Sequence, residues 1–126
     1  MISTMLNAVR DAMTPTIATY RHLAPQGTDR PYAVLNVLPG EIFRTFVAAQ
    51  SFQRNTLRVS LWYDYIQDDT VALTASRAVQ AALDLQTMGG ILLRLAATPG
   101  HYVTDADKGR RTFQIVQNYV YEEVRA

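Results

Sequence analysis

The residues that most often perform acid–base or metal chemistry are few in this chain and widely spaced. Its two histidines are His22 and His101, and neither belongs to a ligand-spaced motif such as HExxH, so we expect no catalytic or metal role for them. Asp105, Asp107 and Gly109 match only the first positions of a calcium-binding loop, because the later ligands and the bidentate glutamate are missing. A solvated turn is the better interpretation of this stretch.

No motif predicts nucleophilic catalysis or a nucleotide cofactor. The patterns GxSxG and GxGxxG and the Walker-type phosphate loop do not occur in the sequence. The chain has no cysteine, which excludes disulfides and thiolate metal sites. The sequence therefore predicts a protein that is not an enzyme and that uses no metal and no cofactor.

Arginine and aromatic residues are the remaining candidates for a binding function. Five arginines could gather on one sheet face beside Trp62: Arg54, Arg58, Arg94, Arg110 and Arg111. An aromatic ring beside arginines on a sheet can bind single-stranded nucleic acid. The formal net charge is only +1, from twelve basic and eleven acidic residues, and gives little long-range attraction for phosphates. We therefore expect no tight DNA binding and interpret Trp62 as the cover of a second small core or as a subunit contact.

The size and composition of the chain favour one soluble domain over residues 1–126. A chain of 126 residues can bury a core without disulfides. No stretch approaches the roughly 20 apolar residues that cross a bilayer. The N-terminal segment lacks the basic start and the continuous apolar run of a signal peptide.

Two segments have the apolar spacing of amphipathic helices. The first covers residues 2–13, ends before Pro15, and places five apolar side chains on one stripe: Ile2, Met5, Leu6, Val9 and Met13. The second follows Asp68 and Asp69, either of which can cap it, and ends at Gly89 and Gly90. Its expected buried stripe is mostly alanine, which lets a helix lie close to a sheet: Val71, Ala75, Ala78, Val79, Ala82 and Leu85.

The other segments read as strands. Residues 16–23 form a short strand or turn, and residues 32–38 (YAVLNVL) are apolar on both faces, as in a central strand covered on both sides. Residues 56–65 alternate, with one apolar face: Leu57, Val59, Leu61, Tyr63 and Tyr65. Residues 91–100 form a strand followed by a turn, and residues 112–124 form a long final strand. The apolar phase of the final strand shifts near Gln117, which predicts a bulge. The whole pattern predicts an α+β fold, with two helices packed on one face of a mostly antiparallel sheet of four to five strands.

Residues 41–53 are apolar without alternation, and two interpretations stay open. They form either a docking arm for another subunit or a segment that folds back on the core. Tyrosine, tryptophan and arginine are enriched at protein interfaces. On the first interpretation, the candidate assembly interface consists of Phe43, Arg44, Phe46 and Trp62.

Four segments, taken in order, resemble the tail terminator (tail-completion) proteins of long-tailed bacteriophages and prophages. They are APQGTDRPYAVLNV, LRVSLWYD, the alanine-rich ASRAVQAALD, and TDADKGRRTFQIVQNYVYEE. The resemblance runs from about His22 to Glu123, and residues 38–53 depart from the pattern.

The resemblance implies a structural role without catalysis. Proteins of that family are α+β subunits that form a ring, usually a hexamer, at the head-proximal end of the tail tube. On this implication, the chain assembles in the host cytoplasm and is part of the virion. Its partners are other copies of itself, the tail tube protein and the head connector, and DNA passes through the ring without specific binding. A neck (head–tail connector) protein and a small nucleic-acid-binding domain are the alternatives.

Overall fold

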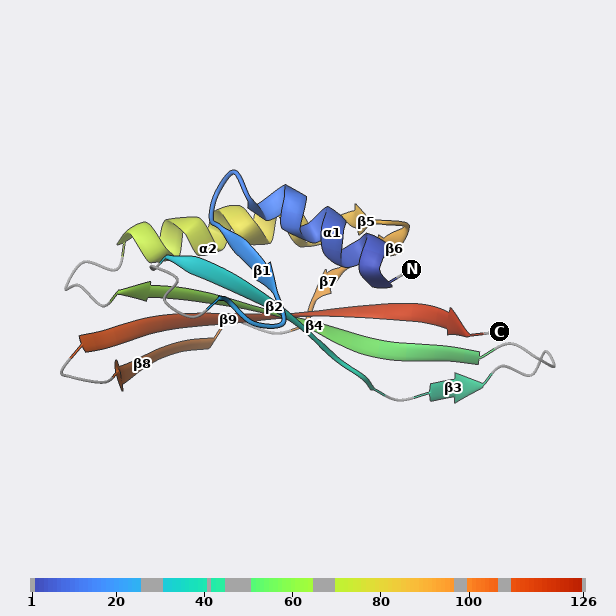
Figure 1. Ribbon diagram of the computed structural model, residues 1–126. Helices are drawn as coiled ribbons and strands as arrows, with labels where there is room; N and C mark the ends of the chain where they lie inside the picture. The colour runs from blue at the N-terminus through green and yellow to red at the C-terminus, as the bar shows by residue number, and fades with distance from the viewer. Residues whose placement is uncertain are drawn as a thin grey trace.

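Two long antiparallel strands, β4 (Ser51–Asp64) and β9 (Arg110–Arg125), form the centre of a twisted sheet in the computed structural model (Figure 1). The structure describes residues 2–25, 31–40, 42–44, 51–64, 70–96, 100–106 and 110–125. Strand β2 (Tyr32–Leu38) pairs antiparallel with β4, and β1 (Thr19–Arg21) pairs parallel with β2. On the other side, β9 pairs antiparallel with β7 (Arg94–Leu95).

Two further strands extend the ends of this sheet. Strand β3 (Ile42–Arg44) pairs with the beginning of β4, and β8 (Gly100–Ala106) pairs with the beginning of β9. A small separate hairpin consists of β5 (Thr87–Met88) and β6 (Ile91–Leu92). The predicted α+β class and mostly antiparallel sheet are confirmed. The sheet has five strands along its main path, with β3 and β8 beside it.

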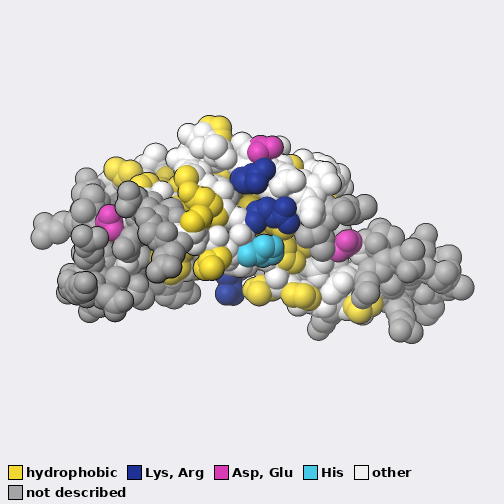
Figure 2. All heavy atoms as spheres, in the orientation of Figure 1, with side chains coloured by type: hydrophobic (Ala, Val, Ile, Leu, Met, Phe, Trp, Pro, Cys, Tyr) yellow, Lys and Arg dark blue, Asp and Glu magenta, His cyan; other side chains and the backbone are white. Residues whose placement is uncertain are grey.

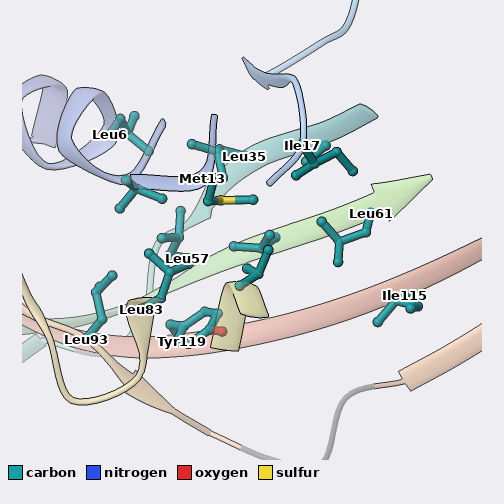
Figure 3. Close-up of a cluster of buried hydrophobic side chains, with 14 of the residues drawn as sticks. Leu6, Met13, Ile17, Leu35, Leu57, Leu61, Leu83, Leu93, Ile115 and Tyr119 are labelled. Atoms are coloured by element: carbon teal, nitrogen blue, oxygen red, sulfur yellow. The ribbon is translucent and has the colours of Figure 1, made fainter. Parts of the chain in front are cut away.

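Helix α1 (Ile2–Met13) buries four of the five side chains that its spacing predicted, and the side chain of Ile2 lies outside the described part of the structure. Met5, Leu6, Val9 and Met13 are at most 1% exposed. Figure 1 shows α1 and α2 (Thr70–Leu83) on the same side of the sheet. Figure 3 shows Leu6 and Met13 of α1 near Leu35 of β2. One hydrophobic cluster thus joins the helices to the sheet.

Helix α2 presents a different face to the core from the one expected. Its buried residues are Ala72, Ser76, Val79 and Leu83, at spacings of four, three and four. Val71 and Leu85 of the expected stripe are 66% and 67% exposed. The prediction was wrong because alanine suits either face of a helix, and because a serine was not expected in the core. The helix also ends at Leu83, before the two glycines.

The reason for the buried serine is a polar contact with the sheet. The amide nitrogen of Gln117 donates to the Ser76 hydroxyl (2.8 Å) and to the Ser76 carbonyl oxygen (2.9 Å). The Gln117 side-chain oxygen accepts a hydrogen bond from the Tyr119 hydroxyl (2.6 Å). Gln117 and Tyr119 are completely buried. A buried amide whose hydrogen-bonding groups have partners fixes the position of α2 on the sheet.

This contact also explains why the predicted bulge is absent from the described pairing. Strands β4 and β9 pair without interruption from Ser51 opposite Arg125 to Asp64 opposite Thr112. The core face of β9 includes Gln117 in an otherwise aromatic and aliphatic row: Phe113, Ile115, Gln117, Tyr119 and Tyr121. The alternation of apolar residues in the sequence is interrupted because a glutamine occupies a core position. The backbone pairing of β4 with β9 keeps its register through this point.

Strand β2 is buried along only part of its length. Ala33, Val34 and Leu35 are buried, whereas Leu38 is 39% exposed. Strand β4 follows its predicted faces, with Leu57, Val59, Leu61 and Tyr63 in the core. The expectation that residues 32–38 are covered on both sides was therefore wrong, because the face with Ala33 and Leu35 lies in the core, whereas Tyr32, Asn36 and Leu38 lie on the opposite, partly exposed face.

Gly89 and Gly90 connect β5 to β6 in a two-residue turn and do not end the helix. Their φ angles are 59° and 84°, and positive φ at both positions is what a type I′ hairpin turn requires. A Cβ atom on Gly89 would lie 2.8 Å from the backbone nitrogen of Met5. The small hairpin thus approaches α1 closely at a position that accepts only glycine.

Candidate assembly surface

The face of the sheet turned away from the core cluster carries a polar and aromatic surface, which we call the open face. Strand register places alternate residues of β2, β4 and β9 on it, with Asn36 opposite Arg58 and Arg58 opposite Asn118. A shallow hollow of about 540 Å³ lies there. Its lining includes Asn36, Arg58, Trp62, Gln114, Val116 and Asn118. The open face can therefore offer both hydrogen-bonding groups and an aromatic ring to a partner.

The aromatic part of the open face is a row of three rings. Trp62 lies beside Tyr32 in a stacked arrangement, with ring centroids 6.5 Å apart and an interplanar angle of 28°. Tyr32 contacts Tyr20 edge to face at 6.4 Å. Trp62 is half-buried. The row runs from β1 across β2 to β4, so that each of the three rings is positioned by a different strand.

The charged part of the open face is a group of arginines around one glutamate. Glu122 Oε1 contacts the guanidinium groups of Arg54 (3.3 Å) and Arg94 (3.5 Å), which come from different strands. A second hollow, of about 380 Å³, is lined partly by Arg54, Arg94 and Val120. Further along β4, the Arg58 Nε donates to the Asn118 Oδ1 at 3.3 Å. This surface is suited to charge-assisted hydrogen bonds with an acidic or polar partner.

Among the predicted interface residues that the structure describes, strand β3 with Phe43 and Arg44 lies apart from Trp62. Phe43 and Arg44 lie in β3, where Phe43 pairs with Phe52 of β4, and Phe46 lies outside the described residues. Trp62 follows Phe52 by ten positions on the same strand, which is roughly 33 Å at about 3.3 Å per residue. Figure 1 shows β3 at one end of the long sheet. Trp62 and β3 are thus two separate surfaces.

The sequence suggested that five arginines could gather near Trp62, of which the structure describes the side chains of Arg54, Arg58 and Arg94, but it did not indicate their neighbours. The missed residues are polar side chains on the open face of β2 and β9: Asn36, Gln114, Asn118 and Glu122. The signal was present in β9, where Gln114, Asn118 and Glu122 alternate with core residues. Gln117 made this signal hard to recognise, because a polar residue in the core row interrupts the alternation of polar and apolar residues.

The other candidates for chemistry do not converge on a site. Among the residues that the structure describes, no three His, Asp or Glu side chains could together hold a metal ion. His22 lies after β1 with a φ of 68°, and its backbone nitrogen donates to the Leu35 carbonyl oxygen. Asp105 lies in β8 with its backbone opposite Arg111, whereas Asp107 and Gly109 lie outside the described residues.

In the part of the chain that is described, no helix is long and apolar enough to cross a membrane.

The buried tyrosines serve the core. Burial raises the pKa of Tyr63, and burial followed by the nearby charge of Asp84 raises the pKa of Tyr119 well above its usual value. Burial also raises the pKa of Tyr121, with Glu123 adding to the increase and Asn55 opposing it. All three phenols are therefore neutral at physiological pH and contribute packing, and the Tyr119 hydroxyl also donates a hydrogen bond to Gln117.

A polar contact also ties β1, at the edge of the sheet, to α1. The Arg21 guanidinium donates to Asn7 Oδ1 (3.3 Å) and to Ser3 Oγ (3.4 Å). Figure 2 shows basic side chains and a histidine gathered near the middle of this view, with hydrophobic side chains around them. The first helix therefore holds the edge strand in place.

Comparison with known proteins identifies similar folds. No family model matches the chain, and no curated protein matches it in sequence. A solved chain from the virion of a native gene transfer agent particle has a TM-score of 0.58 and 17% identity, with 97% of each chain covered. A second solved chain, which carries no functional name, has a TM-score of 0.56 and 16% identity, covering 95% of this chain and 92% of that one. At these identities the likeness shows a shared fold over nearly the whole length of each chain.

Proposed function

We propose that this chain is a structural virion protein that forms a ring at the head-proximal end of a bacteriophage tail tube, ends growth of the tube, and joins the tail to the head. The observation that carries the proposal is the likeness, over 97% of both chains, to a chain of a gene transfer agent virion. The resemblance of the sequence to tail terminator proteins supports the same reading. The role is assembly and involves no catalysis.

The distribution of surface features is consistent with a ring. Closed rings form when one patch of a subunit binds a different patch on the next copy. We assign the two patches to the open face around Trp62 and to the end of the sheet where β3 pairs with β4. Their separation of roughly 33 Å along β4 allows each to contact a different neighbour. The remaining partners are the tail tube protein and the head connector, and DNA passes through the ring without specific binding.

Deletion of the gene in its phage tests the proposal. We expect tail tubes of irregular and excessive length, and heads that remain unjoined, because nothing caps the growing tube. Expression of the wild-type chain from a plasmid restores normal tails and serves as the control. Tails of normal length that are correctly attached to heads would contradict the proposal.

A neck protein is the competing role, and the same experiment separates the two. Without a neck protein, tails reach their normal length but do not attach to heads. Electron micrographs of the lysate report both the length distribution and the attached fraction. Normal length together with failed attachment therefore assigns the chain to the neck.

A further inference from the structure

Two exposed leucines lie at the corner where α2 is followed by the β5–β6 hairpin. Leu85 is 67% exposed and Leu92 is 49% exposed, whereas Ile91 and Leu93 of the same hairpin are buried. The Leu85 nitrogen donates to the Leu93 carbonyl oxygen at 2.8 Å, so Leu85 lies beside the strand segment that carries Leu92. We call Leu85 and Leu92 the leucine pair.

Leu85 occupies a backbone position that favours glycine. Its φ angle is 59°, in the left-handed region where a Cβ atom is sterically unfavourable. The Leu93 nitrogen donates to the Gln86 carbonyl oxygen at 3.0 Å, so Leu85 and Gln86 together face one residue of the other strand. The first position of such a bulge is usually a glycine when its φ is positive. Neither burial nor backbone preference explains a leucine here, which is the pattern of a residue that contacts another molecule.

The same corner carries the negative end of α2 and a carboxylate. The last turn of α2 has no basic residue to offset the C-terminal end of the helix dipole. Asp84 is half-buried, and its Oδ1 accepts a hydrogen bond from the Leu95 nitrogen at 2.9 Å, so the described contacts leave its other oxygen available. Arg77 and Asp84 line one hollow, but they are seven residues apart, or roughly 10 Å along the helix, and no described ion pair joins them. A partner that fits this corner offers a basic group beside apolar surface.

The hollow of the open face around Trp62 has that complementary chemistry. It offers the Trp62 ring and Val116 as apolar surface, and Arg58 is the one charged residue in its described lining. Arg58 uses its Nε for Asn118, and no described contact involves its two terminal nitrogens. The hairpin approaches α1 on the helix side of the sheet, opposite the open face (Figure 1). The leucine pair can therefore reach this hollow only in another copy of the chain.

We propose that the leucine pair of one copy docks in the open-face hollow of the next copy, against Trp62 and Val116. In this contact Arg58 of the receiving copy lies near the negative end of α2 of its neighbour. The two surfaces differ, as a head-to-tail contact requires. Figure 1 shows the hairpin and β3 toward the same end of the sheet, so both belong to the end that meets the neighbour. That the contact closes a ring on a tail tube rests on the proposed function, whereas the contact itself can be measured on the purified chain.

The chain has no cysteine, so introduced thiols can be cross-linked selectively. One variant carries Thr87→Cys, at the exposed position opposite Leu92, and the other carries Gln114→Cys in the hollow. A mixture of the two, treated with a short bismaleimide, should give at least about tenfold more cross-linked dimer than either variant alone, because docking brings two different surfaces together. The matched control is a mixture of Thr87→Cys with Asp11→Cys, which places the second thiol on the exposed side of α1.

Further substitutions locate the effect. Adding Leu85→Asn to the Thr87→Cys chain should lower the dimer yield at least about fivefold without lowering the midpoint of thermal unfolding, because asparagine tolerates a positive φ. Arg58→Glu in the Gln114→Cys chain should also lower the yield, since a carboxylate then faces the negative end of α2. Val71→Asn, at the exposed opposite end of α2, should leave the yield unchanged.

Three results would overturn the proposal: equal yields from the mixture and its control, an unchanged yield with Leu85→Asn, or a lower unfolding midpoint for Leu85→Asn. If the tube protein or the connector covers the leucine pair instead, the first of these results is obtained. Tail length in the deletion phage does not enter this measurement. Failure of the docking contact is therefore distinguishable from failure of the proposed function.

Discussion

At the scale of the residue, the most informative position is Gln117. A completely buried amide is costly unless its donors and acceptor are bonded, and here Ser76 and Tyr119 meet that need. The network links α2 to β9, which are far apart in the sequence. It therefore favours one placement of the helix over others that an alanine-rich surface would permit.

Replacement of Gln117 by leucine should destabilise the protein by about 2–3 kcal/mol, because it leaves the buried hydroxyls of Ser76 and Tyr119 without their partner. Adding Tyr119→Phe should recover part of the loss by removing one of these hydroxyls. Gln114→Leu, the same substitution on the open face of the same strand, should cost less than about 0.5 kcal/mol. Urea denaturation measures all three, and equal effects at Gln117 and Gln114 would show that the network does not contribute.

Stability should also fall steeply in alkali. Tyr119 has a raised pKa in the folded chain because of burial and the charge of Asp84, whereas in the unfolded chain it ionises near its usual value of about 10. Below that pH both states hold the proton, and above it only the folded state does, so the free energy of unfolding decreases as the pH rises beyond about 10. Tyr119→Phe should flatten this decrease. Tyr20→Phe, on the open-face aromatic row, is the control, and identical pH profiles for the two variants would contradict this account.

At the scale of the element, the sequence predicted the strictly periodic segments well. Helix α1 and strand β4 each have one apolar face bounded by polar residues, and the structure buries those faces. Helix α2 offers apolar residues around most of its surface, so periodicity could not select the buried side. The core position of Gln117 likewise depends on a partner across the core, which no local pattern contains.

The rotational orientation of α2 about its own axis can be tested with substitutions at two valines. Val79 is 1% exposed and Val71 is 66% exposed, although the sequence pattern assigned both to one buried stripe. Val79→Ala should lower the free energy of unfolding by about 2 kcal/mol through lost burial and a small cavity. Val71→Ala should change it by less than about 0.5 kcal/mol. Similar losses at both positions would mean that the helix is rotated from the orientation described.

At the scale of the whole molecule, the predicted interface residues separate into two surfaces. Trp62 lies on the open face and Phe43 lies at the β3 end of the sheet. A pattern of residue types can suggest that a surface is used for assembly, but only strand register shows how far apart two such residues lie. The separation is what a head-to-tail contact between copies requires.

If the β3 end docks on a neighbouring copy, the double variant Phe43→Ser, Phe46→Ser should assemble poorly while its subunit remains folded. If these phenylalanines act only at an interface, their loss weakens association between copies without unfolding the isolated chain. Rescue of the deletion phage measures assembly, and thermal unfolding of the purified chain measures folding. Unfolding of the isolated variant would place these residues in the core.

The position of the chain in an intact phage particle tests the central claim most directly. Cryo-electron microscopy of virions that contain the chain should show a closed ring of its copies between the last ring of the tail tube and the head connector. The fold described here, with its long β4–β9 pair, should fit the density of each subunit. Virions without the chain, or with the chain only in the capsid or at the distal tip of the tail, would contradict the account.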